Sequence, residues 1–226
     1  MAVKERASEP LPKLILIADG FTDLAVAPRI IEAVAAGVPW VQLRDHAAGE
    51  ATFARSAERL VHEMRRLSPG IVISVNGRLP VAKALGTGFH TGKRGSGIHE
   101  ALLDPAASRG PVGYSAHDVE EAEEMARLGP DYLFASPVFP TMSKPGQEGM
   151  GTEGLRAFTR SVAVPVFALG GVTPETVPHC LDAEAYGVAV LGGILRASDP
   201  GAAVQAYLAT LRAHTLERRP DVQIQR

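Results

Sequence analysis

Short apolar segments alternate with longer amphipathic segments along most of this chain. A short apolar run bounded by turn residues favours a β-strand, and such runs cover residues 14–18, 38–44, 71–75, 88–92, 111–116, 131–137, 164–171 and 186–194. Helical spacing of apolar residues is clearest in 51–67, at Phe53, Ala57, Leu60, Val61 and Met64. Further helices are predicted near 24–36, 79–85, 98–105, 118–129, 152–162 and 200–214, and from Thr173-Pro174 onward.

Capping residues mark the ends of two of these helices. Asp118 precedes a charged amphipathic run and is suited to an N-cap, while Gly129 follows the run and predicts its end. Pro174 is placed as the first residue of the helix that follows the seventh strand.

The order of the segments predicts the fold. The strands are continuous apolar runs, as expected when helices cover a parallel sheet. Repetition of strand and helix through the chain therefore predicts a single (β/α)8 TIM barrel over residues 12–214, with poorly ordered tails at 1–11 and 215–226. A doubly wound open sheet is the alternative.

Composition narrows the function classes. The chain has 226 residues and a formal net charge of −2, which gives no electrostatic reason to expect nucleic acid or an anionic membrane surface as a partner. Cys180 is the only cysteine, so neither an intrachain disulfide nor a zinc site built from cysteines is possible, and burial as a small apolar residue is its simplest role. The charged N-terminus lacks the apolar core of a secretory signal, and no apolar run approaches the length of a membrane span. We expect a cytoplasmic protein.

Polar residues gather where the predicted strands end, which in a barrel is the face that carries active sites. They are Gln42, Arg44, Asp45 and His46 after the second strand, Asn76-Gly77-Arg78 after the third, and Ser115 and His117 after the fifth. Gln42 and Arg44 share one side of their strand, and an inward-facing arginine needs an anionic partner. That partner is either a substrate or a structural Asp or Glu. His90 and His99 are expected to pack or to cap.

Two glycine pairs suggest a phosphate site. Gly170-Gly171 and Gly192-Gly193 each follow a predicted strand, where backbone amides and a following helix N-terminus can bind an anion. In barrels, phosphate often lies between the loops after strands 7 and 8. The alternative is that both pairs are tight turns.

The loop after the sixth strand offers a further set of anion ligands. Thr141, Ser143 and Lys144 would place two hydroxyls and a cation over the same phosphate. Alternatively, this segment is an ordinary surface loop.

These motifs, in this order, resemble those of the thiamine phosphate synthase/TenI superfamily over about residues 12 to 212. The synthase pattern has VQLRxK, NDR, GxHxGQxD, SxH, GPVFPTxTK, IGGI and VSAI. Here the corresponding segments are VQLRDH (41–46), NGR (76–78), GFHTGKRG (88–95), SAH (115–117), SPVFPTMSK (136–144), LGGV (169–172) and LGGI (191–194). The resemblance implies a TIM barrel that binds a small phosphorylated thiazole.

The departures from the pattern bear on the reaction. In the synthases, the Asp of NDR and the last Asp of GQxD hold the Mg²⁺ that neutralises the diphosphate leaving group. Gly77 and Gly95 occupy these positions here, and His46 replaces a lysine beside the diphosphate. Magnesium requires oxygen ligands, usually carboxylates. The resemblance therefore implies no metal and no other cofactor, with Mg²⁺ expected only if the protein is a synthase.

NGR and KPGQEGMG (144–151) resemble the TenI branch, some members of which are metal-independent thiazole tautomerases. That proton shift needs an acid/base. The branch has a histidine where this chain has Pro137, which leaves His117 and His46 as candidates. The order of hypotheses is a thiazole tautomerase, then a thiamine phosphate synthase, then a non-catalytic ligand-binding or regulatory barrel. Homo-oligomers are possible under each.

Overall fold

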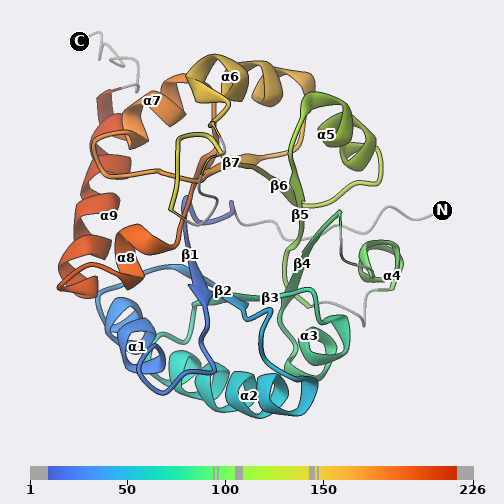
Figure 1. The fold of residues 1–226 in the computed structure, drawn as a ribbon, viewed down its shortest axis with the longest axis vertical. Coiled ribbons are helices and arrows are strands. Elements are labelled where there is room, and N and C mark those ends of the chain that lie inside the picture. Colours follow the sequence, from blue (N-terminus) through green and yellow to red (C-terminus); the bar gives the residue numbers. More distant parts are fainter. Residues whose placement is uncertain are drawn as a thin grey trace, which may run out of the picture.

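The computed structural model describes residues 10–93, 95, 97–104, 109–142, 146 and 148–217, and its eight parallel strands close into a barrel (Figure 1). Each strand pairs with the next, and β1 also pairs with β8, so the sheet has no free edge. The strands are β1 (Leu14–Asp19), β2 (Trp40–Arg44), β3 (Val72–Asn76), β4 (Gly88–Gly92), β5 (Val112–Ala116), β6 (Tyr132–Ala135), β7 (Val166–Leu169) and β8 (Gly187–Val190).

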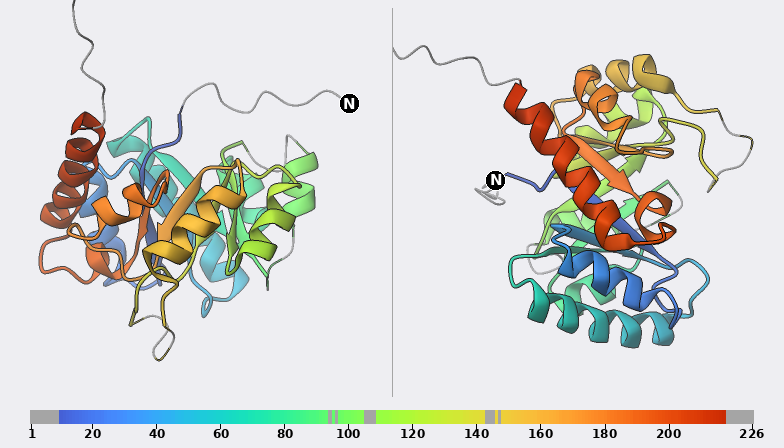
Figure 2. Two further views of the ribbon diagram at one scale, coloured as in Figure 1. Left: turned by 90° about the horizontal axis from the view of Figure 1, so that it is seen from above. Right: turned by 90° about the vertical axis from the view of Figure 1, so that its left-hand side faces the viewer.

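The helices surround this barrel (Figure 1). They are α1 (Ala27–Ala35), α2 (Glu50–Leu67), α3 (Leu79–Leu85), α4 (Ile98–Leu103), α5 (Val119–Ala126), α6 (Gly151–Ser161), α7 (Val177–Asp182), α8 (Gly192–Leu195) and α9 (Pro200–Glu217). The last helix, α9, crosses the outside of the barrel (Figure 2) and packs against α1, α7 and α8. Within the described residues, no helix is both long enough and apolar enough to cross a membrane.

The predicted (β/α)8 barrel is confirmed, while several element bounds differ. The strand predicted over 186–194 ends at Val190, because Gly192–Leu195 form the short helix α8. The helix predicted from Thr173-Pro174 begins only at Val177. Thr176 Oγ1 accepts a hydrogen bond from the Thr173 amide and donates one to the Thr173 carbonyl, which stabilises a turn in place of a first helical turn.

Other local predictions hold. The Asp118 side chain caps α5 by accepting from the Glu121 amide, and Cys180 is buried, which raises the pKa of its thiol to about 12. The domain limits 12–214 and the disorder of the tails remain predictions, since most of both tails lies outside the described residues.

Two apolar cores stabilise the barrel. One lies between the sheet and the helices, and the other fills the barrel with Ile15, Ile17, Trp40, Tyr132, Phe134, Phe167 and Ala189. The ring of Tyr132 fits inside because β5 presents glycine opposite it. A methyl group on Gly113 would overlap the ring of Tyr132. Large and small residues thus alternate around the interior, as close packing in a small barrel requires.

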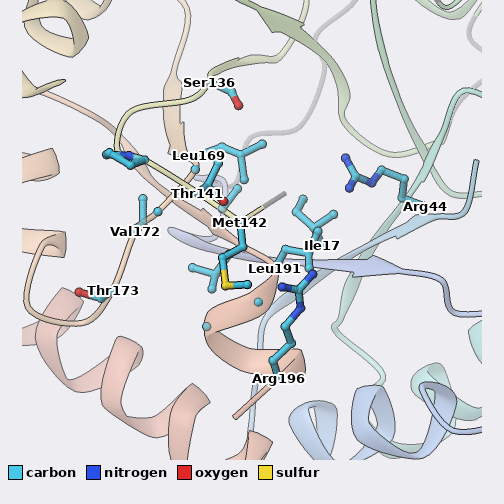
Figure 3. A pocket seen from close by; sticks show the side chains of 17 residues that line it. Ile17, Arg44, Ser136, Thr141, Met142, Leu169, Val172, Thr173, Leu191 and Arg196 are labelled. Carbon is cyan, nitrogen blue, oxygen red and sulfur yellow. The ribbon is translucent and has the colours of Figure 1, made fainter. Parts of the chain in front are cut away.

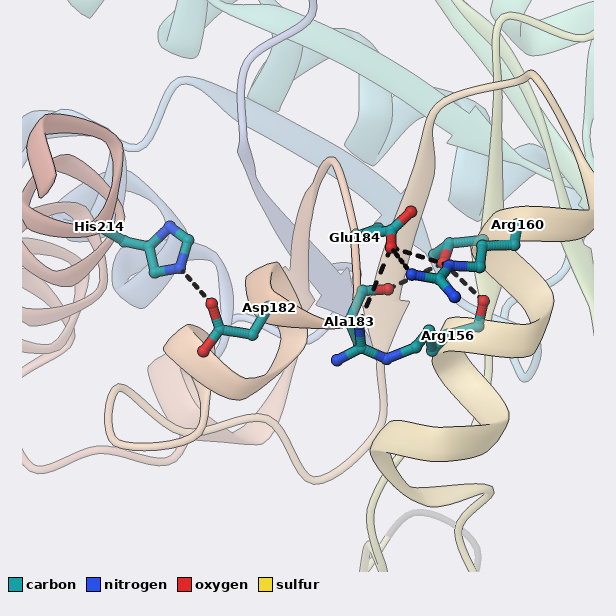
Figure 4. A network of polar contacts seen from close by, with 7 residues as sticks. Arg156, Arg160, Asp182, Ala183, Glu184 and His214 are labelled. Carbon is teal, nitrogen blue, oxygen red and sulfur yellow. Dashed lines mark hydrogen bonds and ion pairs between the residues drawn. The ribbon is translucent and has the colours of Figure 1, made fainter. Parts of the chain in front are cut away.

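A polar network joins the helices near the start of β8 (Figure 4). Glu184, in the turn before β8, accepts from Arg160 at 2.9 Å and lies 3.8 Å from Arg156, both on α6. His214 on α9 contacts Asp182 on α7 at 3.0 Å. Because this turn precedes β8, the network lies at the opposite end from the strand C-termini, where barrel residues serve stability.

Candidate active site

A cavity of about 460 Å³ opens at the C-terminal end of the barrel (Figure 3). It brings together the ends of β1 and β2 with the loops after β6, β7 and β8. Its lining residues are Ile17, Arg44, Ser136, Pro140, Thr141, Met142, Leu169, Gly170, Gly171, Val172, Thr173, Ala189, Val190, Leu191, Gly192, Gly193 and Arg196. Both glycine pairs, Thr141 and Arg44 therefore face one cavity. Ser143 and Lys144 lie outside the described residues.

The pair Gly170-Gly171 has a structural reason that is independent of any ligand. Both residues have positive φ angles, +99° and +64°, which side chains rarely adopt. The segment after β6 also lies directly on them, because the Phe139 amide donates to the Gly170 carbonyl and a methyl group on Gly170 would come within 2.8 Å of Pro137. The tight-turn alternative therefore explains why these two positions are glycine.

The pair Gly192-Gly193 is different. A methyl group on Gly193 would overlap the hydroxyl of Tyr207, whereas one on Gly192 would make only ordinary contacts. The amides of both glycines begin α8 and donate no hydrogen bond within the described part of the chain. Tyr207 reaches across from α9 to donate to the Val172 carbonyl at 2.9 Å, so one buried hydroxyl sets the positions of both loops. Burial and Glu175 raise its pKa to about 12, which keeps it a donor.

Arg44 enters the cavity from β2 already paired with a carboxylate. Its Nε lies 2.8 Å from Oδ1 of Asp19 at the end of β1, the register partner of Arg44. The two side chains are 26% and 37% exposed, so both remain accessible to a ligand. Of the two alternatives for Arg44, the structure provides the structural acid, and a substrate contact remains a prediction.

Gln42 lies two residues before Arg44, on the same face of β2. It is 2% exposed and does not line the cavity. Its Nε2 atom is buried without a geometrically acceptable hydrogen-bond partner in the described structure.

Asn76 is half-buried at the end of β3 and lies outside the cavity lining. The arginine that follows it has a structural role. Arg78 donates to the carbonyls of Asp45 and Ala48 at 3.0 and 2.6 Å, and its guanidinium lies 4.1 Å from the ring centre of Phe53. Arg78 thus fixes the loop between β2 and α2.

Asp45 holds the same loop from inside. Its Oδ1 accepts from the amides of Ala47 and Ala48, and its Oδ2 accepts from the Thr22 hydroxyl at 2.6 Å. Burial works to raise the pKa of Asp45, but these hydrogen bonds outweigh it and hold the pKa below its ordinary value. His46, the next residue, is exposed and outside the cavity lining.

Ser115 is held by a buried histidine. His90 contacts the Ser115 hydroxyl at 2.8 Å through Nε2 and the Tyr132 hydroxyl at 3.0 Å through Nδ1, and its ring lies 4.3 Å from that of Phe134. Burial and the charge of Arg44 lower the pKa of His90 to about 3, so it is neutral near pH 7. His90 packs inside the barrel, as expected, and also positions a candidate site residue.

His117 is exposed after β5 and does not line the cavity. Its Nδ1 lies 2.9 Å from the carbonyl oxygen of Ser136, which can only accept a hydrogen bond. In the neutral imidazole, the proton therefore resides on Nδ1 and the lone pair on Nε2. This is the tautomer that a general base requires.

The residues at the expected magnesium position do not fit that ion. Gly77 has no side chain, and a methyl group on Gly95 would overlap the Thr91 hydroxyl, so a longer side chain there requires Thr91 to move. Among the described residues, no group of three or more His, Cys, Asp or Glu could hold a metal.

Asp19 and Arg196 are site residues that the sequence analysis missed. Asp19 carried a signal, because it ends the first strand at the same level as the other polar strand ends. Arg196 carried none, since it follows LGGI at a position typical of a helix surface.

Comparisons with known proteins identify relatives that cover most of the barrel. The family model described as thiamine monophosphate synthase matches residues 14–194. A thiamine-phosphate synthase of Listeria welshimeri is 33% identical over 174 residues, covering 74% of this chain and 83% of the relative. A putative thiamine-phosphate synthase of Geobacter sulfurreducens is 35% identical over 189 residues, covering 81% and 85%.

Among solved structures, the thiamine phosphate pyrophosphorylase from Pyrococcus furiosus superposes with a TM-score of 0.76 and 27% identity, covering 89% of this chain and 96% of that one. The match of the family model spans most of the barrel and both glycine pairs. The chain therefore belongs to the thiamine monophosphate synthase family.

Proposed function

We propose that this chain is a transferase of thiamine biosynthesis that joins a thiazole phosphate to a hydroxymethylpyrimidine diphosphate. The observation that carries the proposal is the cavity, where unpaired amides of Gly192 and Gly193 and the guanidinium of Arg196 face apolar walls. The names of the relatives support this reaction over the tautomerase that the sequence analysis placed first.

In this proposal, each part of the substrate has a place in the cavity. The amides of Gly192 and Gly193 donate to the phosphoryl oxygens, and Ile17, Leu169 and Leu191 contact the thiazole ring. In the reaction, the thiazole nitrogen forms a bond to the pyrimidine methylene carbon. The carbon–oxygen bond to the diphosphate breaks, and the diphosphate leaves with the bonding electrons. The cavity contributes by holding the two reactants in line and excluding water.

No step is assigned to magnesium. Gly77 and Gly95 offer no carboxylate, and Asp19 is already paired with Arg44. Arg44, which also lines the cavity, is the cation available to a second anionic group.

A proton-shift reaction on the same thiazole phosphate is the second candidate, favoured by the tautomer of His117. With Nδ1 donating to Ser136, Nε2 is a free base at the end of β5. Such a reaction needs a phosphate anchor and an acid/base, with no leaving group to neutralise.

One experiment separates the two. The purified protein is incubated with the pyrimidine diphosphate and thiazole phosphate, with Mg²⁺ or with a chelator, and thiamine phosphate is measured by chromatography. Product formation is expected. If no thiamine phosphate forms with Mg²⁺ and none forms with the chelator, the transferase proposal is contradicted. Isomerisation of the thiazole tautomer, abolished in His117→Ala and retained in the surface variant Arg212→Ala, would then favour the second candidate.

A further inference from the structure

Five side chains form a continuous line of hydrogen bonds inside the barrel. Trp40 Nε1 donates to Ser74 Oγ at 3.1 Å, and Ser74 in turn hydrogen-bonds to the Tyr132 hydroxyl. His90 joins that hydroxyl, 3.0 Å from Nδ1, to the Ser115 hydroxyl, 2.8 Å from Nε2. The first four side chains are buried, and only Ser115 is partly exposed. The line therefore has a closed end at Trp40 and an open end at Ser115.

The closed end fixes the direction of the first two hydrogen bonds. An indole N–H only donates, so Ser74 accepts from Trp40. A buried hydroxyl must also place its own proton, and the one other partner of Ser74 in the described part of the chain is Tyr132. Ser74 therefore donates to Tyr132. Burial raises the pKa of Tyr132 while Ser74 and Gln42 lower it, as donors near its oxygen should, although Gln42 Nε2 makes no hydrogen bond of acceptable geometry.

The direction continues through His90. Because Tyr132 accepts from Ser74, its own buried proton needs an acceptor, and the described residues provide Nδ1 of His90. Burial and the charge of Arg44 lower the pKa of His90 to about 3, so the ring is neutral near pH 7. A neutral imidazole that accepts at Nδ1 carries its single proton on Nε2, which donates to Ser115. The opposite tautomer would leave the Tyr132 proton buried without an acceptor.

Ser115 ends the line, and its own proton has no partner among the residues that the structure describes. We propose that His90 is a positioning residue that occupies the Ser115 oxygen from inside the barrel and so leaves the Ser115 proton for an acceptor atom of a ligand, such as an aromatic ring nitrogen. In the opposite tautomer, Ser115 would donate its proton to His90 and would present only lone pairs to a ligand. That the ligand is one of the two substrates named above rests on the proposed function.

The tautomer is measured first, without any ligand. NMR of protein labelled with ¹⁵N in histidine, at pH 7, distinguishes the protonated ring nitrogen from the bare one, and His90→Gln assigns the signals. We expect the proton of wild-type His90 on Nε2. Tyr132→Phe should shift the Nδ1 resonance because it removes the hydrogen bond that Nδ1 accepts, and Ser115→Ala should shift the Nε2 proton. The control Tyr186→Phe, which loses a hydroxyl bound to the Leu11 carbonyl, should shift neither.

The kinetics of thiamine phosphate formation then test whether His90 acts through Ser115. His90→Leu cannot donate and should lower kcat/KM about tenfold, mainly by raising KM. His90→Gln should keep most of the activity, because its amide can accept from Tyr132 and donate to Ser115 as the Nε2–H tautomer does. In a chain that already carries Ser115→Ala, His90→Leu should change kcat/KM less than twofold.

The two measurements separate the inference from the proposed function. A proton on Nδ1 of wild-type His90 overturns the inference at any level of activity. So does a tenfold loss from His90→Leu that persists in the Ser115→Ala chain, because His90 would then serve the fold alone. If wild type forms no thiamine phosphate, the proposed function fails and NMR decides the inference. An Nε2 proton that shifts in Ser115→Ala then supports it, and an Nε2 proton that does not shift overturns it.

Discussion

The stability of this barrel should fall steeply below pH 6.5 because His90 must stay uncharged. The ring is fully buried between the hydroxyls of Tyr132 and Ser115. Burial and the nearby charge of Arg44 lower its pKa from 6.5 to about 3. Protonation would put a cation inside the barrel with no acid among these contacts to receive it.

The sign and size follow from linkage. As the pH falls, the unfolded chain takes up a proton at this histidine near pH 6.5, and the folded chain does so only near pH 3. The contribution of neutral His90 is therefore complete above pH 6.5 and is lost progressively down to about pH 3. The free energy of unfolding should drop by about 2 kcal/mol at pH 5 and about 3 kcal/mol at pH 4. The lowered pKa of Asp45 makes the stability depend on pH only in a more acidic range, below its unfolded value of 3.8.

The assay is urea unfolding of wild type, His90→Gln and His99→Gln between pH 7 and pH 4. Glutamine at position 90 does not titrate, so His90→Gln should lose about 3 kcal/mol less than wild type over this range. His99→Gln, a change at an exposed histidine, should follow wild type. Parallel pH profiles for wild type and His90→Gln would refute the reasoning. The ring protons of His90, followed by NMR in wild type, give a second measure and should show no titration above pH 4.

Three further predictions concern the loops. Gly193→Ala should lower the free energy of unfolding by about 1–3 kcal/mol, because the added methyl group overlaps the Tyr207 hydroxyl. Adding Tyr207→Phe to Gly193→Ala should recover part of this loss. Urea unfolding tests this, and losses that simply add in the double variant would contradict the overlap. Gly77→Asp with Gly95→Asp should make thiamine phosphate formation rise with Mg²⁺. The positive φ at position 77 should cost about 1 kcal/mol of stability, and the side chain at position 95 adds the cost of displacing the Thr91 hydroxyl. An unchanged Mg²⁺ response argues against a carboxylate site there. Arg78→Ala should speed amide hydrogen exchange in residues 45–50 about tenfold, because it removes the hydrogen bonds to the carbonyls of Asp45 and Ala48. Exchange as slow as in wild type would show that Arg78 does not fix this loop.

The sequence was sufficient for the barrel because hydrophobic periodicity is a local signal repeated through the chain. It also placed both glycine pairs and Arg44 at one end, since strand ends in a barrel share a face. The pairing of Arg44 with Asp19 could not be predicted, because the choice between a ligand and a structural acid depends on the register between β1 and β2. Tyr207 was missed for a similar reason, since its hydroxyl acts on residues far away in the chain.

The site also differs from the sequence-based expectation in how its members are grouped. Gln42, Asn76, Ser115, His46 and His117 do not line the cavity that holds the glycine pairs. Arg44 connects the two groups, because it lines the cavity and also lowers the pKa of His90, which holds Ser115. A polar strand end in the sequence predicts the end of the barrel at which a residue lies. It does not predict which part of that end.

The four glycines of the two pairs carry unequal weight in the phosphate argument. Packing against the loop after β6 accounts for Gly170 and Gly171, and the Tyr207 hydroxyl accounts for Gly193. Gly192 is the exception, because a methyl group there would touch only Arg196 at ordinary contact distance. The fold therefore does not require glycine at 192, and the missing side chain leaves its amide accessible to an anion beneath the Arg196 guanidinium. The case for a phosphate site accordingly rests on Gly192 and Arg196 more than on the repeated glycine motif.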